Sequence, residues 1–181
     1  MPALTKRFKE HDPATLSPAQ KAVFDAIASG PRKTVPYIYH LLLGSAELAE
    51  KAQALGVFCR YGTEFPPRLS ELAILVVARH WDATYEWSVH VHEARKAGLP
   101  ETVIAALEKD ETPVFEDAVE DLVYRFASTY FKNNDVPDDL FAAAQERFGE
   151  KAVVELAGLL GYYSMLAICL RIYRVPPQGE A

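Results

Sequence analysis

Hydrophobic residues recur along this chain at the three- and four-residue spacing of amphipathic helices, and strand-like alternation hardly occurs. In the first predicted helix, Ser17 and Pro18 suit the N-cap and first helical positions, and Gly30 follows the end of the apolar stripe. The same pattern predicts a short apolar segment at 37–43 and helices at 45–61, 69–80, 82–98, 100–107, 113–133, 137–148 and 152–174. The chain is therefore expected to be all-α.

No linker or repeat of repeat-protein length divides the chain. Its 181 residues are enough for one domain with a substantial core. We expect an N-terminal arm at 1–16, a single helical domain at 17–175 and a C-terminal tail at 176–181. The predicted helix at 69–80 is apolar on almost every side, which indicates that it is buried.

Charge and hydropathy exclude several functional classes. The formal net charge is −6 with no long basic run, whereas nucleic-acid binding needs a concentrated basic surface. Residues 1–17 lack the apolar segment of a secretory signal. The apolar stretch at 153–170 is interrupted by Glu155, Gly158 and Gly161, which favours a buried helix over a membrane span. We therefore expect a cytoplasmic protein that binds neither nucleic acid nor membranes.

The two cysteines, Cys59 and Cys169, lie far apart in the sequence and form no CxxC motif. A disulfide framework in a chain of this length normally uses more cysteines. We interpret both as reduced, buried thiols that behave as small apolar residues. A dithiol redox centre therefore has no local support in the sequence.

The predicted helix at 82–98 carries the first candidates for chemistry. Glu86 and His90 are four residues apart at the edge of its apolar face. His92 points nearly the opposite way, so these three side chains have poor geometry for binding a metal ion. A carboxylate beside a buried imidazole favours the charged ring, and desolvation raises the carboxylate's own proton affinity. The pair could thus supply an acid or a base. The alternative is an exposed or half-exposed ion pair on the helix, worth about 0.3–0.5 kcal/mol.

Glu71 is a third candidate, because it stands in an otherwise apolar segment. A buried carboxylate is costly unless it is protonated, paired or hydrogen-bonded. Packing of this helix against the next one would bring Glu71 near Glu86 and His90. Alternatively, Glu71 lies in the first helical turn and complements the helix dipole. The sequence favours neither interpretation over the other.

Four further residues are weaker candidates for contact with a substrate. Arg68 and Arg79 could each supply a cation for an anionic substrate, although both are equally compatible with the protein surface. Trp87 lies on the apolar stripe of the predicted helix at 82–98. His40 precedes an apolar run and could line a cavity, although a place in the core or on the surface is favoured.

Three segments carry a recognisable pattern: 67–75 (PRLSELAIL), 85–90 (YEWSVH) and 94–99 (ARKAGL). They resemble the carboxymuconolactone decarboxylase family, and the combination of EWxxH with AGL is fairly specific. Segments 42–49, 154–156 and 161–163 also resemble its longer members, so the likeness covers roughly residues 30–177. It implies a helical bundle of the alkylhydroperoxidase D type that assembles as a homotrimer or homohexamer.

The resemblance also implies a reaction. The peroxidase branch of the family uses a CxxC pair, a histidine four residues after it and an upstream glutamate. His90 and Glu71 match the histidine and the glutamate, but Ala83 and Glu86 occupy the cysteine positions. Without a thiolate there, thiol peroxidase activity is not expected. The decarboxylase branch acts on 4-carboxymuconolactone without metal or organic cofactor, and it too has a glutamate four residues before the histidine.

We therefore expect a cofactor-free enzyme that decarboxylates a small unsaturated lactone carboxylic acid, with Glu71, Glu86 and His90 as its catalytic residues. Fold similarity does not determine function, so two alternatives stay open. One is another lactone-processing enzyme, such as an isomerase, hydratase or hydrolase, that uses the same residues. The other is a non-catalytic oligomeric binding protein.

Overall fold

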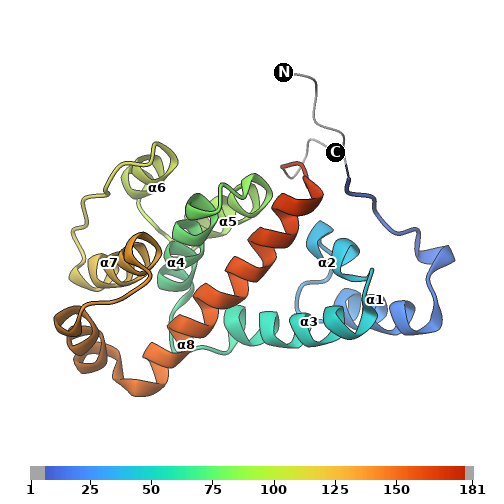
Figure 1. Ribbon diagram of the computed structural model, residues 1–181, viewed down its shortest axis with the longest axis horizontal. Coiled ribbons are helices and arrows are strands. Elements are labelled where there is room, and N and C mark those ends of the chain that lie inside the picture. Colours follow the sequence, from blue (N-terminus) through green and yellow to red (C-terminus); the bar gives the residue numbers. More distant parts are fainter. Residues whose placement is uncertain (1–6, 178–181) are drawn as a thin grey trace.

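The computed structural model describes residues 7–177, and within that range the chain is helical without strands, which confirms the all-α prediction (Figure 1). Residues 1–6 of the expected arm and 178–181 of the expected tail lie outside the described residues. After a short 3-10 turn, η1 (Pro13–Thr15), the helices are α1 (Pro18–Ser29), α2 (Tyr37–Leu42), α3 (Ala46–Tyr61), α4 (Pro67–His80), α5 (Thr84–Lys96), α6 (Glu101–Glu108), α7 (Ala118–Asn133) and α8 (Asp138–Tyr173).

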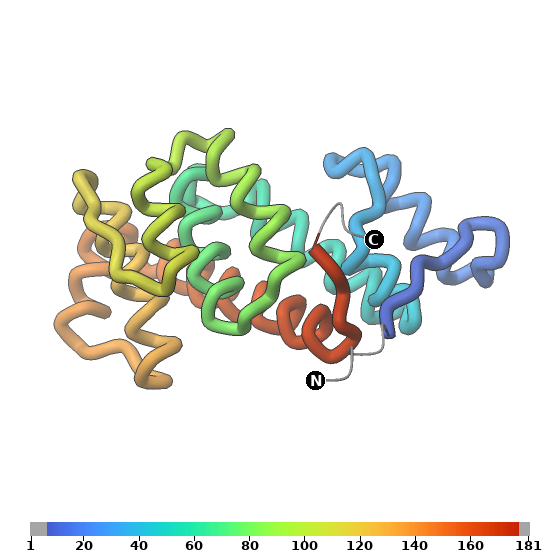
Figure 2. Tube along the Cα trace, turned by 90° about the horizontal axis from the view of Figure 1, so that it is seen from above, coloured from blue at the N-terminus to red at the C-terminus, as the bar shows by residue number. Residues whose placement is uncertain are grey.

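Helix α4 forms the centre of the structure, where it packs against α5, α7 and α8. Helices α1, α2 and α3 lie at one end of the elongated molecule, and α6, α7 and the first part of α8 lie at the other (Figures 1 and 2). Every residue of α4 from 69 to 78 is buried, as its apolar composition predicted. A carboxylate on this helix must therefore find its partner inside the protein.

The first helix begins and ends as its sequence predicted. The Ser17 hydroxyl accepts a hydrogen bond from the backbone N–H of Gln20, and the Gln20 side chain accepts one from the backbone N–H of Ser17. Gly30 follows the last helical residue. The Gln20 amide also donates to the carbonyl of Leu43 at 2.8 Å, which ties α1 to the end of α2.

The described part of the N-terminal arm packs against its own chain. Phe8 is 5% exposed, and its ring centroid lies 5.2 Å from that of Tyr37 on α2. The Arg7 guanidinium donates to the carbonyl of Ile172, near the end of α8, at 3.0 Å. These contacts hold the arm against α2 and α8.

The two largest differences from the predicted helices have local reasons. Helix α7 begins later than predicted because the Asp117 side chain caps it, accepting a hydrogen bond from the Val119 N–H at 2.7 Å. The helices predicted at 137–148 and 152–174 form one element, α8, interrupted at Gly149 with φ 82° and ψ 164°. Residues other than glycine rarely adopt this backbone conformation. Gly149 therefore interrupts the helix at the point where the sequence predicted that the first of the two helices ends.

By length and composition, α8 would be able to cross a membrane. Of its most apolar 18-residue stretch, 56% is buried inside the protein. A buried core helix of a soluble protein can have the same length and apolar composition. Because α8 packs against α3, α4 and α7, its apolar character has a structural explanation within the chain.

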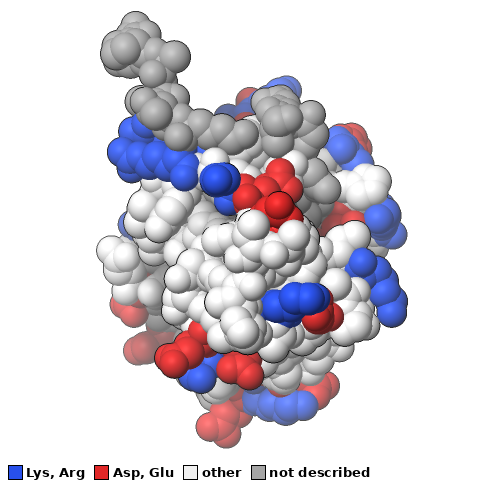
Figure 3. All heavy atoms as spheres, turned by 90° about the vertical axis from the view of Figure 1, so that its right-hand side faces the viewer, with Lys and Arg blue, Asp and Glu red and all other residues white. Residues whose placement is uncertain are grey.

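Charged side chains of both signs alternate around a broad uncharged area at the α1–α3 end of the molecule (Figure 3). Lys and Arg on this face lie next to Asp and Glu (Figure 3). On α1, the exposed side chains of Lys21 and Asp25 form an ion pair at 2.7 Å. Charge on this face is therefore mixed and locally compensated.

Gly56 allows α3 to lie close against two tyrosines. A Cβ atom added there would lie 2.7 Å from Cζ of Tyr162 and 2.8 Å from the hydroxyl of Tyr39. We expect Gly56→Ala to lower the free energy of unfolding by about 1–3 kcal/mol, because both buried rings would have to move. Chemical denaturation followed by circular dichroism measures this change.

Gly158→Ala in α8 is the matched control, because an added Cβ there meets no atom within 4 Å. Alanine favours a helix over glycine, so this variant should match the wild type or gain up to about 1 kcal/mol. Equal losses in the two variants would contradict a close approach specific to Gly56.

Candidate active site

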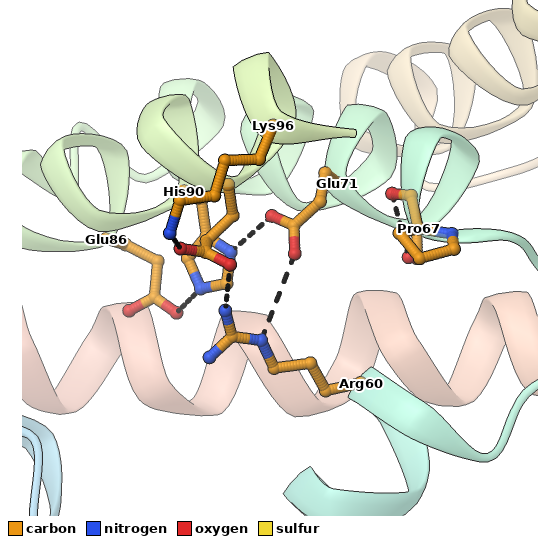
Figure 4. Close-up of polar contacts among 8 residues, drawn as sticks. Arg60, Pro67, Glu71, Glu86, His90 and Lys96 are labelled. Atoms are coloured by element: carbon orange, nitrogen blue, oxygen red, sulfur yellow. Dashed lines mark hydrogen bonds and ion pairs between the residues drawn. The ribbon is translucent and has the colours of Figure 1, made fainter. Parts of the chain in front are cut away.

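The candidate site is built around His90, which α5 places against α4. Its Nδ1 atom lies 2.6 Å from Oε2 of Glu71 on α4, and both side chains are buried (Figure 4). The predicted approach of these two helices is therefore confirmed. Glu71 lies beyond the first turn of α4, so its hydrogen bond to the imidazole, rather than the helix dipole, accounts for its burial.

Glu86 approaches the other ring nitrogen of the same histidine. Its Oε1 lies 3.6 Å from Nε2 of His90, and the two side chains are 4% and 6% exposed. The exposed ion pair considered as an alternative is therefore wrong, whereas His92 faces solvent as predicted. A neutral imidazole offers one donor and one acceptor, so only the protonated ring could donate toward both carboxylates.

Arg60, in the last turn of α3, brings a positive charge to this cluster. Its Nε lies 4.0 Å from Oε1 of Glu71, and its Nη2 lies 3.0 Å from Oε2 of Glu93 on α5. Glu93 also accepts a hydrogen bond from Lys96 at 2.9 Å. Alternating charges thus lead from the surface to the buried imidazole of His90 (Figure 4).

Tyrosines surround the remaining sides of the site. The ring of Tyr163 meets that of His90 edge-on, with centroids 5.1 Å apart. The hydroxyl groups of Tyr39 and Tyr162 lie 2.9 Å apart and share a hydrogen bond. Burial, reinforced by the neighbouring carboxylates, raises the pKa of Tyr163 well above its usual value. Tyr163 is therefore a neutral phenol at physiological pH.

A cavity of about 40 Å³ adjoins the two acid–base groups of α5. It has room for about one water molecule or a group of similar size. Arg32, Arg60 and Val89 are half-buried, so their side of the cavity lies nearest to solvent. The residues that line it include Arg32, Arg60, Tyr85, Glu86, His90 and Tyr163.

Burial also changes the protonation of Glu86. Desolvation raises the pKa of this carboxyl to about 7, a shift that His90 and Arg60 oppose and Glu71 increases. Near neutral pH, Glu86 is therefore present in both its acid and its carboxylate form. A group that both releases and takes up protons works best with such a pKa.

The two arginines predicted to meet a substrate lie elsewhere. Arg68 pairs with the buried carboxylate of Glu120 on α7, and this ion pair links α4 to α7. The guanidinium of Arg79 lies 5.7 Å from the ring centroid of Trp87. None of Arg68, Arg79 and Trp87 lines the cavity beside His90.

His40 is buried in α2, where its Nδ1 accepts a hydrogen bond from the backbone N–H of His11 at 3.2 Å. The Phe24 ring lies edge-on to it, with centroids 5.7 Å apart. His40 therefore packs against α1 and the N-terminal arm and does not line the cavity beside His90.

Sequence reasoning missed Arg32, Arg60 and the contact of Tyr163 with His90. In the sequence, Arg60 is a cation at a helix end, where it also suits the helix dipole. The sequence of α8 carries no local signal that Tyr163 contacts His90. Only the packing of α3, α5, α8 and the segment between α1 and α2 brings these side chains to the cavity beside His90.

The cysteines lie outside the site. Cys59 is buried and Cys169 is half-buried, and neither lines the cavity beside His90. Desolvation raises the pKa of the Cys59 thiol to about 11, and burial also raises the pKa of Cys169. Both thiols are therefore protonated near neutral pH, which lowers their nucleophilicity.

No group of three or more His, Cys, Asp or Glu side chains within residues 7–177 is arranged to hold a metal ion. A scan against models of known protein families found no match, and a search of curated proteins found none either. Geometry and the sequence resemblance are therefore the grounds for a functional proposal.

Glu86→Gln tests the raised pKa through protein stability. In the folded protein Glu86 keeps its proton up to about pH 7, whereas an unperturbed glutamate releases it near 4.5. The folded state therefore binds more protons between these values, so stability from this group is complete below about pH 4 and is lost as the pH rises through 7. Glutamine stays neutral throughout this range.

The stability of Glu86→Gln relative to wild type should therefore rise between pH 5 and pH 8, by at most an order of 3 kcal/mol. Unfolding free energies of both proteins at several pH values measure this difference. A difference that does not change with pH would contradict the assignment of this titration to Glu86.

Proposed function

We propose that this protein is a cofactor-free acid–base enzyme of the carboxymuconolactone decarboxylase family that decarboxylates a small unsaturated lactone carboxylic acid. The main support is one observation: His90 lies buried between Glu71 and Glu86 beside a cavity. The resemblance at 67–75, 85–90 and 94–99 supports the same family.

In the proposed reaction, the substrate carboxylate leaves as CO₂. The electron pair of the broken carbon–carbon bond moves into the unsaturated lactone and forms a dienolate. Protonated His90 then delivers a proton to carbon from Nε2, the ring nitrogen that faces Glu86. Solvent restores that proton after product release. The imidazolium and the nearby guanidinium of Arg60 stabilise the negative charge of the dienolate while it exists.

The two glutamates have different proposed roles. Glu71 holds Nδ1 of His90 through the short hydrogen bond, which orients the ring so that Nε2 faces the cavity side and Glu86. Glu86, with its pKa raised to about 7, exchanges protons with Nε2 and with solvent. A substrate larger than the cavity requires the half-buried rim at Arg32, Arg60 and Val89 to move outward.

An isomerase is the second candidate, and the titration of Glu86 favours it specifically. A group with a pKa near 7 can remove a proton from one carbon and return it to another. Such a reaction would move a double bond in a lactone without releasing CO₂. Analysis of the product therefore separates the two reactions.

We also propose that the protein acts in the cytoplasm as a homotrimer or homohexamer, with a small carboxylic acid or lactone as its substrate. Exposed apolar side chains support self-association, because water-exposed apolar surface is stabilised when a partner covers it. On α3 these side chains are Leu48, Leu55, Phe58 and Tyr61.

Turnover of 4-carboxymuconolactone, followed by its ultraviolet absorbance, is the direct test. The wild type should consume the compound and release CO₂, and His90→Ala should lower kcat by at least about 100-fold through loss of the proton donor. His92→Ala on the same helix is the matched control, since His92 is exposed and should leave kcat unchanged. Lack of turnover by the wild type would remove this substrate from the proposal.

The cysteines lead to a separate expectation. With both thiols protonated and outside the cavity, hydroperoxide reduction with a dithiol reductant should stay at the rate of the reaction without enzyme. A Cys59→Ser/Cys169→Ser protein should decarboxylate as fast as the wild type. Thiol-dependent peroxide turnover would contradict this assignment of the chemistry.

A further inference from the structure

Two guanidinium groups line the cavity that holds the acid–base residues. Arg32 comes from the segment between α1 and α2, and Arg60 comes from the end of α3. Both are half-buried. Glu71 and Glu86 on the inner side would repel an anionic ligand, so a cation is needed if such a ligand is to bind there.

In the described part of the chain, the contacts of Arg32 are with uncharged groups. Its Nη1 lies 3.3 Å from the amide oxygen of Gln53, and its guanidinium lies over the ring of Tyr39, 5.0 Å from the centroid. Within residues 7–177, Arg32 forms no ion pair. A half-buried cation without a counter-ion attracts an anion more strongly than a fully solvated one does.

Arg60 forms an ion pair with Glu93, a partner that the carboxylate of a ligand can replace. Glu93 lies 3.0 Å from it on the solvent side and is 30% exposed. Burial alone would raise the pKa of Glu93, but Lys96 and Arg60 outweigh that effect and lower it, so Glu93 is ionised at neutral pH. If Glu93 leaves Arg60, it keeps Lys96 and water as partners.

We propose that Arg32 and Arg60 together bind the carboxylate that a substrate retains through the reaction, and that this carboxylate replaces Glu93 as the partner of Arg60. The cavity of about 40 Å³ admits a group of that size. A carboxylate that must leave as CO₂ would be stabilised in its ground state by two arginines, which would slow the reaction.

The part of this inference that concerns a carboxylate retained through the reaction rests on the proposed function. The new element of the inference is the assignment of Arg32 and Arg60 as the residues that bind that carboxylate. Binding of a carboxylate by the two arginines is a property of the resting protein, so it can be measured without turnover.

The probes are 2-furoate and 2-furamide, two unsaturated five-membered rings of similar shape that differ in charge. Calorimetric titration of the full-length protein should show furoate binding at least about tenfold more tightly than furamide. Arg32→Gln and Arg60→Gln should each weaken furoate binding by about 10- to 100-fold, the range for a charged hydrogen bond. Furamide binding should stay the same in both variants.

Glu93→Gln should have the opposite effect and tighten furoate binding by about threefold or more, because Arg60 loses its competing carboxylate. A folding defect cannot produce tighter binding, so this variant keeps the test decisive even if Arg60→Gln is unstable. Arg125→Gln on α7 is the matched control, since its exposed pair with Asp121 lies outside the cavity. It should bind furoate as the wild type does.

The inference is overturned if furoate does not bind, if furamide binds equally well, or if furoate affinity is the same in Arg32→Gln, Arg60→Gln and wild type. The same holds if 4-carboxymuconolactone is turned over with an unchanged KM in both arginine variants, a result that leaves the proposed reaction intact. Arginine-dependent furoate binding without any decarboxylation supports the inference and removes the proposed reaction instead.

Discussion

Two carboxylates buried against one imidazole are the constraint on which this structure depends. Glu71 and Glu86 cannot remain deep in an apolar core without partners, and His90 lies between them. Their common position requires α4 and α5 to pack in a single register. The buried apolar face of α4 stabilises this packing, while the polar cluster selects the register.

The surroundings of this cluster decide its chemistry. Tyr163 and the neighbouring helices exclude water, which raises the pKa of Glu86 into the physiological range. Arg60 opposes this shift and keeps the cluster from carrying an uncompensated negative charge. An acid and a base are thus available at neutral pH without a metal ion taking part in the proposed reaction.

The connection from the cluster to the surface is the basis of the proposed preference for an anionic ligand. Arg60 shares its charge between buried Glu71 and half-exposed Glu93, and Arg32 adds a second cation at the same cavity. An anion that displaces Glu93 at the rim therefore meets two guanidinium groups before it meets the buried carboxylates of Glu71 and Glu86. This order of charges supports the proposed binding of an acidic substrate, which Glu71 and Glu86 alone would repel.

The sequence by itself determined the helices, their caps at Ser17 and Gly30, and the i,i+4 pair of Glu86 and His90, because these features depend on residues within one or two turns of each other. It identified Glu71 as a candidate but left its partner open, since a lone carboxylate in an apolar helix has several ways to be satisfied.

Only the tertiary structure decided that Glu71 bonds Nδ1 of His90 and that Arg60, rather than Arg68 or Arg79, reaches this pair. Both results depend on how α3, α4, α5 and α8 cross, which follows from the packing of whole helix faces. Arg68 and Arg79 have neighbours of their own in Glu120 and Trp87, and no local pattern shows which arginine turns inward.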